Sequence, residues 1–182
     1  MLKTATLLFA LVFCSQAFGL EHRTGLKVEL PDTFVVTQVR PLRIFEAVIG
    51  IKLASGETFG TTVPNLCEAT FDAQPGWIAF RQSRFNDKLS APTFPRDYAR
   101  QVSSIFSVLR SERFETRGIV GYEFVMVPHS NPALVTVTSV METPAGKTAL
   151  TCLTARQLLP RAISVFRTIL TGVTPPAGGI SR

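Results

Sequence analysis

The sequence predicts an α+β domain in which a mainly antiparallel sheet is covered by helices. Three strand-like stretches follow one another at Tyr122–Val127, Leu134–Glu142 and Lys147–Leu153, with a tight hairpin expected at Thr143–Gly146. Apolar residues at helical spacing come directly before this group of strands, and a second helical pattern follows it. Strands, a helix, three strands and a helix are therefore the predicted order.

The N-terminal half adds further strand patterns. Leu26, Val28 and Leu30 alternate with charged residues, which is typical of a half-buried strand. The other expected elements are strands at 34–39 and 44–53, a short strand near Thr58, and a hairpin of Cys67–Asp72 and Trp77–Arg81 around a type II turn at Pro75-Gly76.

Two helices are expected. Pro95 suits a helix start, and an apolar stripe then extends the first helix to Arg110, at Tyr98, Val102, Ile105, Phe106 and Leu109. A short edge strand, Phe114–Arg117, follows. Thr154 and Gln157 match a capping box that would open the final helix, within which Pro160 either makes a kink or starts the main portion.

The first nineteen residues are typical of a secretory signal peptide. Lys3 gives the positive segment, Leu7–Phe13 the apolar segment, and Ala17-Phe18-Gly19 a cleavage site, so we expect cleavage after Gly19. The alternative, lipidation at Cys14, is opposed by the bulky Phe13. No later stretch is long and apolar enough for a membrane span. We expect one domain over 20–172, a flexible tail over 173–182, and a periplasmic or secreted location.

Two cysteines remain after such cleavage, Cys67 and Cys152. An even number of cysteines in an oxidising compartment predicts a disulfide between them, and two buried free thiols are the alternative. A zinc site is disfavoured because the remaining chain has only His22 and His129 and no paired cysteine spacing. We expect no cofactor and no metal.

The sequence offers little for catalysis. His22 falls in an N-terminal stretch expected to be flexible, and His129 has only Ser130 as a neighbouring nucleophile, a spacing that rarely gives the required geometry. Carboxylate pairs such as Glu112/Glu115 fit a solvated face better than an acid–base pair. We therefore expect that the protein is not an enzyme.

Basic and aromatic residues are interleaved in the long connection before the first helix. Arginine and aromatic side chains are frequent at the centres of protein interfaces. With a formal net charge of +6, this favours a protein partner with an acidic surface, and the compartment argues against nucleic acid. The alternative is that the phenylalanines are core and the arginines solvated. The predicted partner-binding residues are Arg81, Arg84, Phe85, Lys88, Phe94, Arg96, Arg100, His129 and Asn131.

Together, the helix Asp97–Arg110, the strand around Tyr122-Glu123-Phe124, the hairpin Leu134–Leu153 and the closing helix resemble the Mog1/PsbP/DcrB-like superfamily. The resemblance covers roughly the last 85 residues. It implies an αβα sandwich that serves as a binding scaffold without a shared catalytic motif. Some periplasmic immunity proteins that neutralise wall-degrading toxins look similar too.

Two functional hypotheses follow. The first is a periplasmic protein-binding module, with an immunity protein that blocks a secreted cell-wall-degrading effector as its specific form. The second is an envelope accessory protein that binds a small ligand or lipid in a pocket between sheet and helices. The oligomeric state is left open.

Overall fold

The computed structural model describes residues 18–39, 45–73 and 88–177. Most of the predicted signal peptide, the Pro75-Gly76 turn, the strand Trp77–Arg81 and the loop up to Asp87 lie outside these residues. Among the described residues, no helix is both long enough and apolar enough to cross a membrane.

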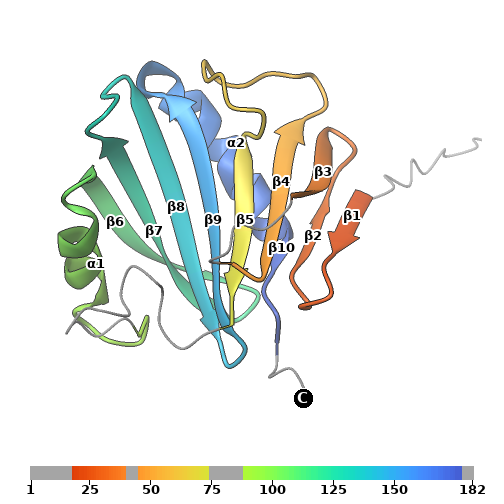
Figure 1. The fold of residues 1–182 in the computed structure, drawn as a ribbon, viewed down its shortest axis with the longest axis horizontal. Coiled ribbons are helices and arrows are strands. Elements are labelled where there is room, and N and C mark those ends of the chain that lie inside the picture. Colours follow the sequence, from red (N-terminus) through yellow and green to blue (C-terminus); the bar gives the residue numbers. More distant parts are fainter. Residues whose placement is uncertain (1–17, 40–44, 74–87, 178–182) are drawn as a thin grey trace, which may run out of the picture.

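Within the described residues, ten strands form two antiparallel sheets (Figure 1). The large sheet has the order β3-β4-β5-β9-β8-β7-β6, and the small sheet has the order β1-β2-β10. The large sheet contains β3 (Phe34–Val39), β4 (Ala47–Leu53), β5 (Cys67–Asp72), β6 (Phe106–Thr116), β7 (Ile119–Pro128), β8 (Leu134–Thr143) and β9 (Gly146–Ala155); the small sheet contains β1 (Phe18–Glu21), β2 (Lys27–Leu30) and β10 (Val173–Thr174).

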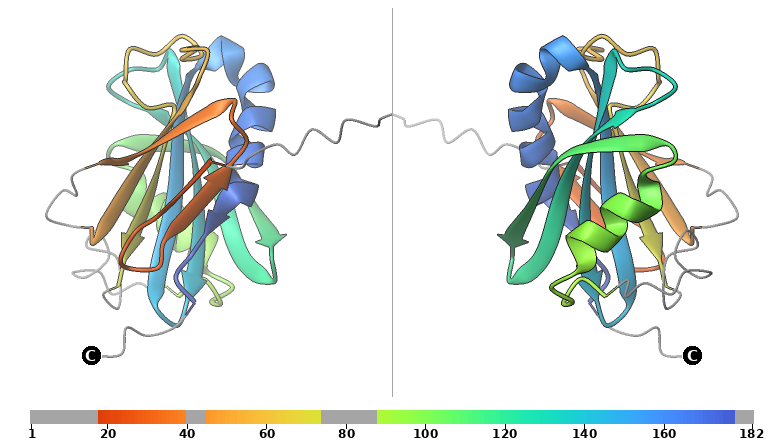
Figure 2. Two further views of the ribbon diagram at one scale, coloured as in Figure 1. Left: turned by 90° about the vertical axis from the view of Figure 1, so that its right-hand side faces the viewer. Right: turned by 90° about the vertical axis from the view of Figure 1, so that its left-hand side faces the viewer.

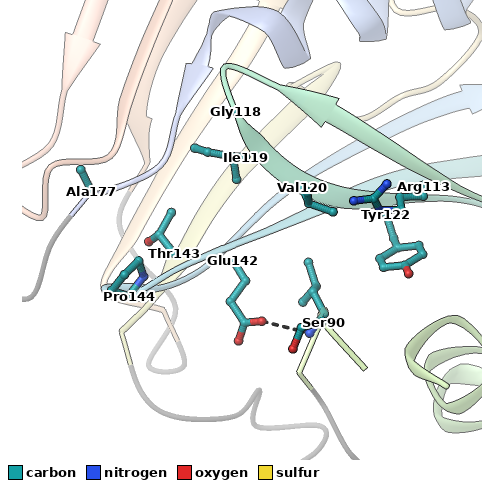
Figure 3. Close-up of a pocket in the computed structure, with 11 residues that line it drawn as sticks. Ser90, Arg113, Gly118, Ile119, Val120, Tyr122, Glu142, Thr143, Pro144 and Ala177 are labelled. Atoms are coloured by element: carbon teal, nitrogen blue, oxygen red, sulfur yellow. Dashed lines mark hydrogen bonds between the residues drawn. The ribbon is translucent and has the colours of Figure 1, made fainter. Parts of the chain in front are cut away.

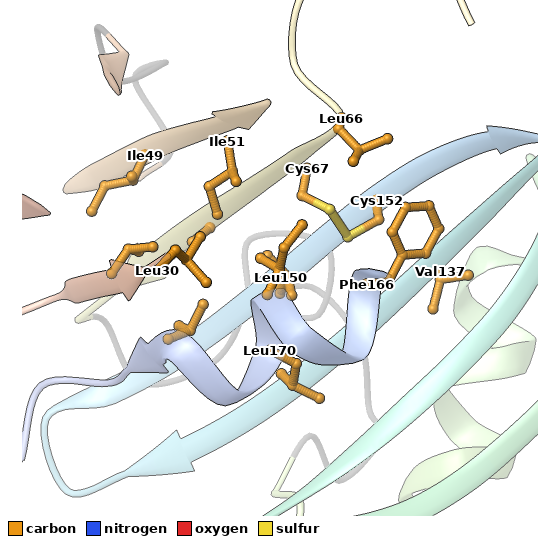
Figure 4. Close-up of a cluster of buried hydrophobic side chains, with 14 of the residues drawn as sticks. Leu30, Ile49, Ile51, Leu66, Cys67, Val137, Leu150, Cys152, Phe166 and Leu170 are labelled. Atoms are coloured by element: carbon orange, nitrogen blue, oxygen red, sulfur yellow. A yellow bond between two sulfur atoms is a disulfide. The ribbon is translucent and has the colours of Figure 1, made fainter. Parts of the chain in front are cut away.

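One helix covers each face of the large sheet (Figure 2). Helix α2 (Leu159–Gly172) buries Phe166 and Ile169 against the main core, to which β2, β4, β5, β8 and β9 also contribute (Figure 4). Helix α1 (Phe94–Val102) buries Phe94 and Tyr98 against the opposite face, where they meet Phe124 of β7. The predicted class, an α+β sandwich with a mainly antiparallel sheet, is confirmed.

The predicted disulfide is formed. Cys67 on β5 lies opposite Cys152 on β9, with an S–S distance of 2.09 Å, and both residues are buried in the main core (Figure 4). The bridge joins two neighbouring central strands that are 85 positions apart in the sequence. The alternative of two free thiols is therefore excluded in this structure.

Several strands also match their predictions. Strand β3 has the predicted bounds Phe34–Val39, and the β8–β9 hairpin closes at Thr143 and Gly146. For β3 the β-rich composition was sufficient, and for the hairpin the Pro and Gly of the turn fix the register. Alternation contributes little in β8, where Val135 to Met141 are all buried.

The first helix is shorter than predicted. It ends at Val102, and residues from Phe106 onward form β6 rather than two further helical turns. Ile105 and Leu109, assigned to the buried stripe, are 59% and 54% exposed. Long-range pairing with β7 prevails over the local helical spacing, and an irregularity in the register at Leu109 conceals the alternation of β6 from the sequence pattern.

The predicted capping box at Thr154 does not form. Thr154 lies within β9, and its hydroxyl donates to the carbonyl oxygens of Phe59 and Ala155, at 3.3 and 3.2 Å. A short 3₁₀ turn, Arg156–Leu158, then leads into α2, where Pro160 occupies the first turn. Pro160 therefore lies at the start of the helix and does not kink it.

The short strand expected near Thr58 is absent from the described residues. That segment is a loop in which Phe59 is buried and meets Phe166 of α2 edge to face, with ring centroids 6.4 Å apart. The carbonyl oxygen of Phe59 also accepts the amide of Ala155 at 2.8 Å, which attaches the loop to the end of β9.

Both ends of the predicted domain differ from expectation. Val173, assigned to the tail, is buried in β10 and pairs with Val28 of β2. His22 was expected in a flexible stretch, but it is buried at the β1–β2 turn, where its Nδ1 lies 3.0 Å from the Thr24 hydroxyl. Strand β1 starts at Phe18, two positions before the predicted mature N-terminus, and cleavage after Gly19 stays a prediction.

Candidate functional site

The predicted partner-binding residues do not form one cluster. Arg81, Arg84 and Phe85 lie outside the described residues. Phe94 is 2% exposed and belongs to the core beneath α1, so the prediction that it contacts a partner is wrong. Its neighbours in that core are the rings of Tyr98, Tyr122 and Phe124.

The exposed members of the set lie at the two ends of α1. Beside Lys88, the Leu89 amide donates to Glu142 near the end of β8, whereas the His129 amide donates to Ile105, just after α1. Glu142 near the end of β8 and the start of β8 beside Asn131 are about 25 Å apart along that strand, at roughly 3.3 Å per residue. Lys88 and Asn131 therefore cannot contact the same small ligand.

His129 has one polar side-chain contact. Its Nε2 lies 3.0 Å from the Ser107 hydroxyl, on an exposed part of the surface. Among the described residues, no carboxylate orients its other ring nitrogen. The pair therefore offers no geometric basis for proposing nucleophilic chemistry.

The described part of the chain holds no group of three or more histidine, cysteine, aspartate or glutamate side chains that could ligate a metal ion.

A pocket of about 660 Å³ opens on the α1 side of the sheet (Figure 3). It lies where the loop before α1, the β6–β7 hairpin, the β8–β9 hairpin and the C-terminal segment come together. A volume of this size is in the range of small-molecule sites. Its lining is Leu89, Ser90, Arg113, Gly118, Ile119, Val120, Tyr122, Glu142, Thr143, Pro144 and Ala177.

Arg113 and Tyr122 form one end of this pocket. They are directly opposite each other on β6 and β7, so both side chains project from the same face of the sheet (Figure 3). Tyr122 is half-buried, with its ring 5.5 Å from that of Phe94. Neither the guanidinium of Arg113 nor the hydroxyl of Tyr122 has a hydrogen-bond partner among the described residues, and both can donate to a ligand.

Glu142 marks the other end. One carboxylate oxygen accepts the Leu89 amide at 2.9 Å, and the other lies 3.6 Å from the ammonium group of Lys147 (Figure 3). Lys147 is itself buried, with 6% of its side chain exposed. These two contacts fix the position of the Glu142 carboxylate at the pocket wall.

The β6–β7 hairpin brings Arg113 to the pocket. Its two-residue turn consists of Arg117 and Gly118, which both have positive φ angles, 51° and 75°. This geometry is that of a type I′ turn, whose twist matches paired strands. The guanidinium of Arg117 also donates to the hydroxyl of Thr174, which fixes the hairpin against β10.

This pocket was not predicted from the sequence. Arg113 fell between the predicted helix and the predicted edge strand, so it had no assigned face. The signal available was the Arg117-Gly118 pair between two β-rich stretches, which is typical of a hairpin with a two-residue turn. Extending that hairpin outward from the turn places Arg113 opposite Tyr122.

The opposite face carries a second polar cluster. Glu123, 7% exposed at its side chain, lies 3.5 Å from Arg110 and 3.3 Å from Arg167 of α2. Glu112 is also within reach of both arginines. A hollow of about 340 Å³ adjoins the cluster, lined by Arg110, Val125, Leu159, Pro160, Ile163 and Arg167. Because every charge here is paired, the cluster is best explained as structural.

Comparison with known proteins gives a match in fold. No family model and no curated protein matches the sequence. The solution structure of cyanobacterial PsbP (CyanoP) from Synechocystis sp. PCC 6803 superposes with a TM-score of 0.55 at 12% identity, over 91% of this chain and 95% of that one. A protein of unknown function from Pseudomonas aeruginosa, PA94, gives a TM-score of 0.44 at 10% identity, over 87% of this chain and 96% of that one. The chain therefore has a PsbP/Mog1-like fold.

Proposed function

We propose that the protein is an exported, non-enzymatic binding module that recognises a partner protein with an acidic surface. The observation that carries the proposal is the solvent-facing side of α1. Arg96 and Arg100 are one helical turn apart and both exposed, while Phe94 and Tyr98 on the other side of the helix are buried. Lys88 adds an exposed basic residue before the helix.

The charges on α1 suit such a partner. The Arg96 side chain is 70% exposed, and its acidic neighbour among the described residues is Asp97, at 3.6 Å from Nε. The Arg96 guanidinium is mostly exposed and has further donors, so a partner carboxylate can reach it while the contact to the buried Asp97 is kept. Arginine is also able to bind a carboxylate through two parallel hydrogen bonds.

Export is supported by two features. A disulfide such as Cys67–Cys152 persists in oxidising compartments, and the PsbP-like fold is compatible with an exported protein. We place the protein in the periplasm on these grounds together with the signal-like N-terminus. As the specific form of the module we propose an immunity protein whose basic helix covers the acidic cleft of a secreted cell-wall-degrading effector.

Charge reversal on α1 tests the proposal. Tagged wild-type protein is used to capture partners from an envelope extract, in parallel with Arg96→Glu/Arg100→Glu and with the control Arg156→Glu. Arg156 is also exposed, but it follows β9 at the opposite end of the molecule from Lys88. We expect a partner that is retained by wild type and control and lost with the double variant, whose circular dichroism stays that of wild type.

Equal recovery of every captured protein by the wild type and the double variant would show that α1 is not the interface. Capture of an effector whose hydrolytic activity is unchanged by stoichiometric wild-type protein would reject the immunity role while leaving the binding role in place.

A further inference from the structure

We propose that the pocket between Arg113 and Glu142 binds a small monocarboxylate with an apolar body. This binding site is separate from the protein interface on the exposed side of α1 and does not depend on it. It is formed by strand ends and hairpins of the sheet, with one anion-binding end, an apolar wall and one end of negative charge.

The anion-binding end consists of Arg113 and Tyr122. Their cross-strand pairing places a guanidinium and a phenol hydroxyl beside each other, both without a hydrogen-bond partner among the described residues. A carboxylate can accept hydrogen bonds from both groups, with two from the arginine. Most other basic groups in the described structure have an acidic or hydroxyl partner, such as Arg110, Arg167, Lys147 and Arg117.

The wall between the two ends is apolar. Val120 from β7 is half-buried, Leu89 is buried, and Pro144 comes from the β8–β9 turn. Ile119 borders the pocket near the β6–β7 turn and packs against the main core. These side chains can cover a hydrocarbon segment and remove it from water, which gives binding free energy in proportion to the apolar area buried.

Glu142 gives the site its selectivity. Its carboxylate is fixed by the Leu89 amide and Lys147, so it cannot readily turn away from the pocket. Arg113 on β6 and Glu142 on β8 are two strands apart, about 10 Å across the sheet. A ligand of that length with a second carboxylate would meet Glu142 with like charge, which disfavours dicarboxylates.

The direct test measures binding of octanoate to the full-length protein by calorimetry, in parallel with octanedioate and 1-octanol. These probes have similar length and differ in the number of carboxylates. We expect octanoate to bind, and both octanedioate and 1-octanol to bind at least several-fold more weakly. Equal binding of octanoate and 1-octanol, or no binding of octanoate, overturns the proposal.

Variants locate the site. Arg113→Gln should weaken octanoate binding roughly tenfold, because a charge-assisted hydrogen bond is lost, and Tyr122→Phe should weaken it by a smaller factor while keeping the ring. Arg156→Gln removes the same charge far from the pocket and should leave the affinity unchanged. An equal loss with Arg113→Gln and Arg156→Gln would mean nonspecific charge attraction and would reject the site.

The carboxylate could belong to a free acid or to the C-terminus of a peptide. A short apolar peptide with a free C-terminal carboxylate, compared with its amide, separates these sources. Octanoate binding without peptide binding assigns the site to small acids. Binding of the peptide acid alone, lost in Arg113→Gln, would overturn the small-molecule assignment.

Discussion

Cys67 and Cys152 lie directly opposite each other on β5 and β9, with their Cα atoms 4.0 Å apart and each side chain about 1% exposed. The bond therefore crosses the centre of the large sheet, at the point where its N-terminal strands join its C-terminal strands. Beside it, the Leu153 amide donates to Leu66 at 3.1 Å, so backbone hydrogen bonds reinforce the same junction.

Removal of this bond should destabilise the fold strongly. In the chain-entropy model, closing a loop of this length contributes about 4 kcal/mol to the free energy of unfolding. We expect Cys67→Ala/Cys152→Ala to lose most of that amount in denaturant unfolding, and reduced wild type to behave like the variant. Unchanged midpoints for both would show that the bond contributes nothing to stability.

Replacing Thr148 should stabilise the folded protein. It is fully buried, and its hydroxyl has no hydrogen-bond partner among the described residues. Thr148→Val replaces this hydroxyl with a methyl group of similar size, so we expect the free energy of unfolding to rise by about 1 kcal/mol.

Thr154→Val is the matched control for that change. Its hydroxyl donates to the Phe59 carbonyl oxygen, so the variant should lose roughly 1 kcal/mol. Denaturant midpoints that move in the same direction for both threonines would contradict this explanation.

Glu123 should be important for stability. Its buried carboxylate is shared by Arg110 and Arg167, whose side chains are about half exposed, so solvent screens part of the attraction. Glu123→Gln should lower the free energy of unfolding by about 1 kcal/mol. Glu29→Gln breaks the exposed pair with Lys27 and should change the free energy of unfolding much less. An equal loss in the two variants would reject the difference between the buried and the exposed pair.

His22 should make stability depend on pH. Burial, and to a smaller extent the nearby Arg23, lowers its pKa in the folded protein below the usual 6.5. The unfolded chain therefore takes up a proton first as the pH falls, and the favourable contribution of neutral His22, complete above pH 6.5, is lost toward the lowered pKa.

The difference between wild type and His22→Gln isolates this effect. Unfolding free energies measured at several pH values should show wild type losing more stability than the variant as the pH falls below 6.5. Parallel curves would mean that His22 has the same pKa in both states.

The sequence was informative where burial alternates and turns have defined chemistry. Strand β3 was predicted with its bounds and the β8–β9 hairpin with its turn, and the even number of cysteines left after the expected cleavage predicted the disulfide. These features are local, or depend on the compartment, so one sequence is enough to recognise them.

The missed features depend on contacts between distant segments. Residues 106–110 have apolar spacing that fits a helix, and only pairing with β7 makes them a strand. The same error left the position of Arg113 on the sheet unassigned, because its face is defined by pairing with Tyr122. Thr154 matched a cap motif, but its hydroxyl binds the carbonyl of Phe59, which is 95 positions away.

The central claim is that the pocket between Arg113 and Glu142, on the α1 side of the large sheet, binds a small carboxylate. Amide chemical-shift mapping of the isotopically labelled protein during titration with octanoate tests it most directly. We predict the largest changes at Ser90, Arg113, Tyr122 and Glu142, and little change at Ile163 and Arg167 in the hollow beside α2. Changes concentrated at Ile163 and Arg167 would contradict the claim.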